Sequence, residues 1–265
     1  MHRLDARALA RHCLRGWKAA CAASLLILAT ASAASAVTTP AVPGSPDLRD
    51  PKVPASIPNI SGTWFTRGFN PLTKPDDGSP TPWQPWTKEA FDKRQKAQKD
   101  GAPMVDPTAA CLPSGIPRLI AAPYPLQIIQ TPDKVVFLYE VQHLFRVIHM
   151  NAKHPANPGR SFMGHSVGHW EGDTLVIDTV GLNMMTQVDE SGTLHSDQLR
   201  VVERIRKTAD GTLEDRFTIH DPKAFTKPWT AVRTFNFQPD LRFLEYICEE
   251  NNRNAPDATG VLRKF

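Results

Sequence analysis

From Leu126 onward the chain alternates short apolar runs with tight-turn signals. Runs rich in Val, Ile, Phe and Thr are separated by Gly, Asp and Pro, the residues that tight turns require. Four hairpins are predicted, with turns at TPDK, EGD, ADGT and QPD, and no segment after Ala102 has helical periodicity. Successive hairpins form a meander, which commonly hides its edge strands by closing into an up-and-down barrel. The pattern therefore predicts an all-β, antiparallel barrel over residues 111–265.

The preceding part of the chain is rich in proline. Eighteen of the 24 prolines fall within residues 40–132, and proline lacks the N–H that helix interiors and central strands require. We therefore expect residues 37–110 to form a Pro-rich arm. Within this arm the pattern predicts one strand at 60–65 and one helix at 88–99, with Thr87 as the N-cap of the helix.

The first 36 residues form a third kind of segment. A basic stretch ends at Lys18, an apolar run follows over residues 19–29, and small residues lead to Ala34-Ser35-Ala36. This order is typical of a signal peptide, and the apolar run is shorter than the ~20 residues of a membrane span. We expect cleavage near Ala36, export to the periplasm or medium, and no transmembrane span in the mature chain.

The net charge of +4 belongs to this leader. Residues 1–36 carry five basic residues and one acidic residue, which leaves 26 basic and 26 acidic residues in the mature chain. Because no positive surplus remains to neutralise phosphates, we expect no nucleic-acid partner. The sequence also lacks a phosphate-binding Gly-rich loop and a dinucleotide fingerprint, so no organic cofactor is expected.

Two cysteines, Cys111 and Cys248, remain after removal of the leader. An even pair in an exported chain usually forms a disulfide. Neither cysteine has a histidine or basic cluster beside it in the sequence, which argues against a nucleophilic thiol. We predict a Cys111–Cys248 disulfide, with two buried thiols or a reactive cysteine as the alternatives.

Several motifs together resemble a widespread family of exported bacterial proteins with a β-rich, lipocalin-like build. The motifs are GHSVGHWEGDTLVIDT, HSDQLRVVER, DPKAFTKPW and EYICEEN, and the resemblance covers roughly Cys111 to Asn251. In addition, Gly62-Thr63-Trp64 fits the G-x-W that often opens a lipocalin barrel. The resemblance implies export and a barrel, and it implies no settled activity. The chain departs from the family at residues 151–153, where Asn-Ala-Lys replaces an Asp-Gly-Arg-like turn.

Six of the nine histidines lie between His143 and His195. His165 and His169 are four residues apart on a predicted strand, which separates them by about 13 Å. Zinc requires ligands at about 2.1 Å, so these two histidines cannot share one metal ion. We predict no metal site, and a site formed with residues of neighbouring strands is the alternative.

The turn after these histidines determines what faces them. With a two-residue turn at 172–173, Val167 opposes Asp178, which then lies diagonal to both His165 and His169 on one face of the sheet. A carboxylate in that place can fix an imidazole tautomer and make the ring a better base. A three-residue turn with a bulge would move Asp178 to the opposite face. The sequence leaves both registers open.

Charged residues also stand in step with apolar neighbours along the predicted strands. Arg146, Glu203 and Glu245 each alternate in phase with leucine, isoleucine, valine or phenylalanine. Charges on an apolar face must be paired or must serve a ligand. An internal ion-pair network and a polar lumen built for a ligand therefore both remain open. For the second case the predicted ligand-binding residues are Arg146, Tyr246, Glu203 and Glu245.

These residues suggest an exported enzyme without an organic cofactor. We expect a small, partly apolar molecule in the barrel lumen, and acid–base chemistry that performs elimination, isomerisation or hydrolysis, as in a lyase or an isomerase. The candidate catalytic residues are His165, His169, His149, Asp178 and Glu140.

Two other functions stay open. One is a non-catalytic carrier of a small hydrophobic or aromatic ligand, and the other is an envelope interaction module that uses the Pro-rich arm. A serine hydrolase is not expected, because the G-x-S-x-G at residues 164–168 lacks the required strand-to-helix elbow. The sequence indicates neither the substrate nor the oligomeric state.

Overall fold

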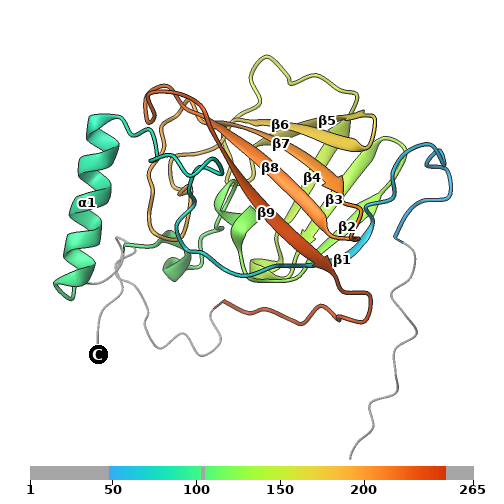
Figure 1. The fold of residues 1–265 in the computed structure, drawn as a ribbon, viewed down its shortest axis with the longest axis horizontal. Coiled ribbons are helices and arrows are strands. Elements are labelled where there is room, and N and C mark those ends of the chain that lie inside the picture. The colour runs from blue at the N-terminus through green and yellow to red at the C-terminus, as the bar shows by residue number, and fades with distance from the viewer. Residues whose placement is uncertain (1–47, 103–104, 249–265) are drawn as a thin grey trace, which may run out of the picture. The chain divides into compact units, whose positions relative to one another are not determined.

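The strands close into a barrel in the computed structural model, which describes residues 48–102 and 105–248 (Figure 1). Within these ranges the strand order follows the chain, and the last strand returns to pair with the first. The strands are β1 (Gly62–Thr66), β2 (Leu126–Gln130), β3 (Lys134–Tyr139), β4 (Phe145–Met150), β5 (His165–Glu171), β6 (Thr174–Val180), β7 (Arg200–Lys207), β8 (Leu213–His220) and β9 (Trp229–Phe237). The all-β barrel is therefore confirmed, and the predicted signal peptide 1–36 lies outside the described residues.

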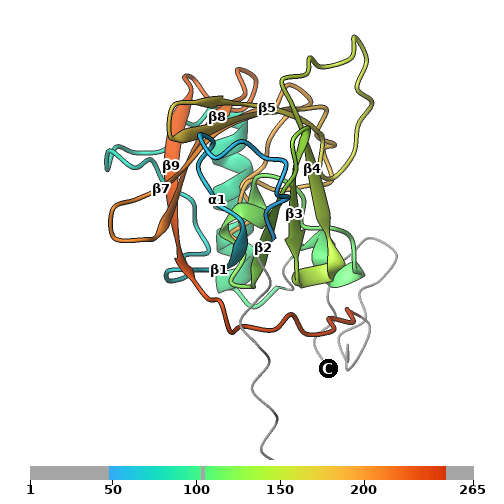
Figure 2. The same cartoon turned by 90° about the vertical axis from the view of Figure 1, so that its right-hand side faces the viewer.

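One strand pair departs from the antiparallel prediction. β4 and β5 run parallel, with Ile148–Met150 opposite Ser166–Gly168 (Figure 2). A parallel pair requires a crossover of about a dozen residues or more, and residues 151–164 provide one. β4 and β5 pair over these three residues, and the two strands separate on the N-terminal side of this stretch.

β1 belongs to the barrel rather than to a separate arm. Its Trp64 pairs with Leu126 of β2 on one side and with Phe237 of β9 on the other. The Trp64 ring is fully buried and its indole N–H donates to the carbonyl oxygen of Ile60 at 2.9 Å. The barrel consequently begins before residue 111.

The fourth predicted hairpin is wrong, because residues 241–248 form no strand. The edge of β9 that this segment was expected to cover is instead occupied by β1. Residues 241–248, which we call the C-terminal strap, are held by two side chains near the turn between β3 and β4. The carboxylate of Glu140 accepts a hydrogen bond from the Leu244 N–H, and the imidazole of His143 accepts one from the Tyr246 N–H.

A single α-helix, α1 (Pro85–Lys99), is present among the described residues. It begins three residues earlier than predicted, since Gln84 is the N-cap and Pro85 occupies the first turn, where its missing N–H has no cost. Thr87 is not the cap. Its hydroxyl donates to the carbonyl oxygen of Ala224 at 2.6 Å and so fixes the helix to the loop after β8.

Apolar side chains fill the barrel interior. The largest fully buried ones include Trp64, Phe137, Phe217, Ile128 and Ile177. A cavity of about 10 Å³ lies beside Asp215, which is room for a single water molecule. This cavity is too small for the organic substrate that the sequence led us to expect in the lumen.

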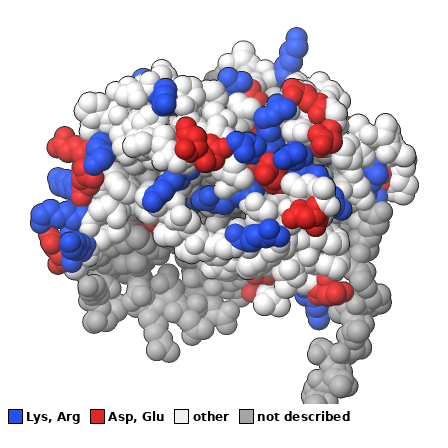
Figure 3. Space-filling model, in the orientation of Figure 1, with Lys and Arg blue, Asp and Glu red and all other residues white. Residues whose placement is uncertain are grey.

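Basic and acidic residues are interspersed on the face shown in Figure 3. Three arginines of β7 and β8 form ion pairs: Arg204 with Glu171, Arg206 with Glu214, and Arg216 with Asp76. These pairs compensate the charges of the three arginines, whereas an uncompensated positive field is what attracts a polyanion.

Candidate functional site

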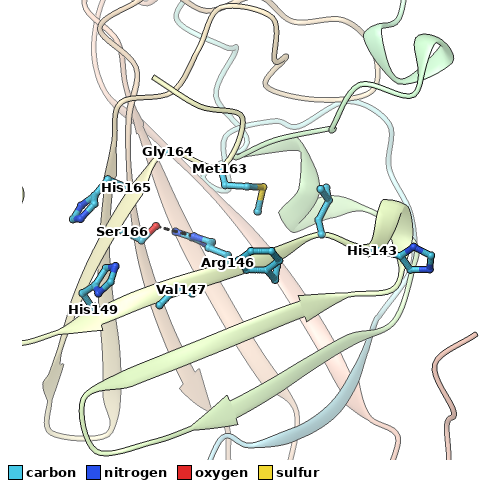
Figure 4. A pocket seen from close by; sticks show the side chains of 10 residues that line it. His143, Arg146, Val147, His149, Met163, Gly164, His165 and Ser166 are labelled. Atoms are coloured by element: carbon cyan, nitrogen blue, oxygen red, sulfur yellow. Dashed lines mark hydrogen bonds between the residues drawn. The ribbon is translucent and has the colours of Figure 1, made fainter. Parts of the chain in front are cut away.

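A pocket of about 370 Å³ opens in the barrel wall where β4 and β5 separate (Figure 4). We call it the seam pocket, and it is formed mainly by residues that precede the paired stretch of the two strands. Its lining comprises three histidines (His143, His149 and His165), five apolar residues (Leu144, Phe145, Val147, Met163 and Gly164) and two polar residues of the wall (Arg146 and Ser166). This is a concave, mixed surface of the size that small-molecule sites have.

The β5–β6 hairpin has the register that a two-residue turn produces. Glu171 pairs with Thr174 across the turn, and Val167 pairs with Asp178. His165, His169 and Asp178 therefore share one face, as that register predicts. Along β5, however, Ser166 and Gly168 are buried whereas the histidines are not, so this face is the outside of the barrel and not its lumen.

A chain of imidazoles runs along the outer face beside the pocket. The rings of His149 and His165 stack, with centroids 5.3 Å apart and an angle of 11° between their planes. Nδ1 of His165 lies 2.9 Å from Nδ1 of His154, which belongs to the β4–β5 crossover. Nε2 of His154 is buried and lies 3.6 Å from Oδ2 of Asp178. We call these four residues the imidazole chain.

Arg200 holds the carboxylate at the end of the imidazole chain. Its Nε and Nη2 donate to the two Asp178 oxygens, each at 2.8 Å. Burial alone would raise the pKa of Asp178, but the hydrogen bonds and charge of Arg200, followed by those of His154, lower it. The carboxylate is therefore ionised and favours a proton on the nitrogen of His154 that faces it.

At 3.6 Å the carboxylate is too far from Nε2 of His154 for a hydrogen bond, but its charge favours one tautomer of each histidine. A neutral His154 with its proton on Nε2 has a lone pair on Nδ1, so the Nδ1–H of His165 must be the donor of the contact between them. His165 then carries a lone pair on Nε2. Partial burial lowers the pKa of His165, as do the neighbouring His154 and His149. His165 is thus neutral at neutral pH, with one nitrogen available as a base.

The other predicted catalytic residues lie apart from this chain. His169 is half exposed and contacts Glu171 at 3.1 Å. Glu140 is bonded to the C-terminal strap, as described above. In the strap itself, Glu245 is exposed and Tyr246 packs edge-on against Tyr124 with ring centroids 5.7 Å apart. Because the strap is not a β-strand of the barrel, it does not place Glu245 or Tyr246 in the lumen.

Arg146 and Glu203 form an internal ion pair. Both side chains are buried, and Nη1 of Arg146 donates to Oε1 of Glu203 at 2.9 Å while Nη2 donates to the other oxygen. Arg146 also donates to Ser166 Oγ at 2.9 Å and to Thr179 Oγ1 at 2.6 Å. The geometry favours the ion-pair network over a ligand-binding role, since protein oxygens already take the guanidinium N–H groups.

Asp215 shares the interior with this pair. Burial, with the adjacent Glu203 carboxylate, raises the pKa of Asp215 well above its usual value. Asp215, Glu203 and Arg146 therefore form one electrostatically coupled group in the barrel interior.

The predicted disulfide is confirmed, with Cα atoms of Cys111 and Cys248 5.7 Å apart. It fastens the end of the C-terminal strap to the loop before β2. Over the residues that the structure describes, no helix is long and apolar enough to cross a membrane. No group of three or more His, Cys, Asp or Glu side chains in these same ranges is arranged to hold a metal ion.

His143 and His154 were not among the predicted site residues. Both lie outside the strands, in the β3–β4 turn and the β4–β5 crossover, where alternation gives no information on direction. The density of histidines between residues 143 and 195 was the available signal. This density indicated the correct part of the chain but did not single out His143 and His154.

The fold and the site together define a closed β-barrel protein with a histidine-lined pocket in its wall. No protein-family model matches the chain, and no curated protein matches it. Among solved structures, the crystal structure of the wild-type fluorescent protein UnaG is similar at a TM-score of 0.33 and 18% identity, over 68% of this chain and 97% of that one. A likeness this distant carries no argument about function.

Proposed function

We propose that the protein is an exported acid–base enzyme without an organic cofactor. Its substrate, a small and partly apolar molecule, binds in the seam pocket and gives a proton to His165. The observation that carries the proposal is the Nδ1–Nδ1 contact between His165 and His154, whose other nitrogen faces an ionised carboxylate. Export is inferred from the signal-like residues 1–36, and the disulfide is consistent with it.

The proton balance of the proposed step uses only groups of the imidazole chain. Nε2 of His165 accepts a proton from a C–H or O–H of the substrate, and the Nδ1 proton of His165 passes to Nδ1 of His154. The resulting imidazolium of His154 lies beside Asp178, which stabilises it. Return of the proton to a different substrate atom gives isomerisation. Its transfer to a departing group gives elimination.

The lining of the pocket supports a second candidate, the non-catalytic carrier. Leu144, Phe145, Val147 and Met163 give the pocket an apolar patch, and Phe145 is 63% exposed. An apolar ligand would cover this patch without any need for the histidines. A carrier would therefore keep its affinity, and leave its ligand unchanged, after the imidazoles are removed.

Replacement of His165 by alanine should reduce turnover by about 10²–10⁴-fold, the usual contribution of a general base. The measurement is ¹H NMR of the mature protein in D₂O with a panel of small carbonyl compounds and phenols, following deuterium incorporation and product formation. His169→Ala is the matched control, since His169 is on the same strand and face but outside the imidazole chain. Equal turnover by His165→Ala and the unchanged protein would exclude the base role and favour the carrier.

The free energy of unfolding should decrease as the pH falls below 6.5. Burial lowers the pKa of His165, His195 and His220 from the usual 6.5. In that range these three histidines bind more protons in the unfolded chain than in the folded one, so their titration favours unfolding on acidification. Urea unfolding at about pH 7.5 and about pH 5.5 measures the decrease. His165→Gln should show a smaller decrease, and an equal one would mean that His165 titrates normally.

A further inference from the structure

His143 lies at the opposite end of the seam pocket from His165 (Figure 4). Six positions of chain separate it from His149, whose ring stacks on His165. Because His143 and His165 stand at opposite ends of the pocket, a molecule that contacts both must be elongated.

The backbone that presents His143 is strained. Gln142 and His143 have φ angles of 56° and 50°, in the left-handed region that residues other than glycine seldom adopt. The Gln142 side chain holds this turn, because its amide donates to the Leu112 carbonyl at 2.8 Å and accepts from the Ser114 N–H at 2.9 Å. Such conformations persist where the surrounding structure imposes them, and they are frequent at functional sites.

The C-terminal strap determines the tautomer of His143. The Tyr246 N–H donates to Nε2 of the ring at 2.9 Å, so this nitrogen carries the lone pair and Nδ1 carries the proton. His143 therefore has a donor to offer, whereas the tautomer derived for His165 offers an acceptor. Between the two, the apolar residues Leu144, Phe145 and Met163 line the pocket.

We propose that His143 is the hydrogen-bond donor that selects the substrate, and that the substrate is an elongated phenol of about two rings with an acceptor oxygen at its far end. The inference rests on the proposed function, since it assigns the acidic hydroxyl to His165. The phenol meets the His165 lone pair, the rings cover the apolar patch, and the far oxygen accepts from Nδ1 of His143. Met163 suits such a ligand because thioethers pack favourably against aromatic rings.

Two probes of matched shape test this assignment. One is 4-acetyl-4′-hydroxybiphenyl, which has the acceptor oxygen, and the other is 4-ethyl-4′-hydroxybiphenyl, which lacks it. Calorimetry should show that the acetyl probe binds about 10-fold more tightly, as one hydrogen bond provides. His143→Leu should abolish this difference and leave the affinity for the ethyl probe unchanged, which also reports that the variant is folded. His143→Gln, which keeps an N–H donor, should retain part of the difference.

The outcomes separate the two proposals. Equal affinities of the unchanged protein for both probes, a difference that survives His143→Leu, or no binding of either probe would each overturn the role of His143 and the substrate class. The His165→Ala variant tests the proposed function. Its affinity for both probes should fall by the same factor, because both probes carry the hydroxyl that His165 contacts. If His165→Ala binds both probes as the unchanged protein does while the acetyl preference persists, the base assignment fails and the donor assignment stands.

Discussion

Arg146→Met should lower the free energy of unfolding by about 3–5 kcal/mol, the cost of breaking a buried ion pair from one side. Arg146 is 2% exposed and Glu203 is 0% exposed, so the substitution leaves a carboxylate without a counter-charge in the barrel interior. It also removes the hydrogen bonds to Ser166 and Thr179. Urea denaturation at neutral pH measures the loss as a shift in the midpoint at constant slope.

Two further variants show whether the loss arises from the unpaired charge. Arg146→Met combined with Glu203→Leu should recover most of the stability, because apolar replacement of both partners is often neutral. Arg200→Met removes a half-exposed arginine from its pair with Asp178 and should cost less than about 1 kcal/mol. A loss below that value for Arg146→Met would show that the internal pair is not needed for stability.

Loss of the Cys111–Cys248 disulfide should lower the free energy of unfolding by about 4 kcal/mol, since cross-links that close long loops constrain the unfolded chain most. The bond joins residues 137 positions apart, and the closed loop contains β2 to β9. Urea unfolding with and without reductant measures the effect.

The double variant Cys111→Ser and Cys248→Ser provides the control for the disulfide. It should unfold at the midpoint of the reduced protein and should not respond to reductant. If reduction leaves the midpoint of the unchanged protein in place, the cross-link does not stabilise the fold.

Turn chemistry made much of the barrel predictable. In the β5–β6 hairpin, the short Gly-Asp turn limited the register to two alternatives, and the structure adopts the one with a two-residue turn. The alternation also placed Arg146 and Glu203 correctly on the buried face, in phase with their apolar neighbours. These are local signals, and each can be read within one or two strands.

Long-range pairing could not be predicted from the same signals. The parallel arrangement of β4 and β5 depends on the path of residues 151–164, which have no periodicity. Strand parity shows which residues share a face but not which face points inward. His165 and Asp178 share a face, as one of the two predicted registers requires, but this face is the outside of the barrel and not the lumen. The alternation of Glu245 with apolar neighbours did not predict where its side chain lies. Its segment forms no strand, and β1 pairs with β9 in its place.

The pairing of β1 with β9 determines when the barrel can close during synthesis of the protein. Trp64 pairs with Phe237, 237 − 64 = 173 positions later, so the ribosome makes one partner of this junction long before the other. Neighbouring hairpins can pair as they emerge, but the ring cannot be completed until β9 is made, and contacts so distant in sequence form slowly. Until then both edge strands of the growing sheet can pair with other chains, and β proteins are most prone to aggregate in this state.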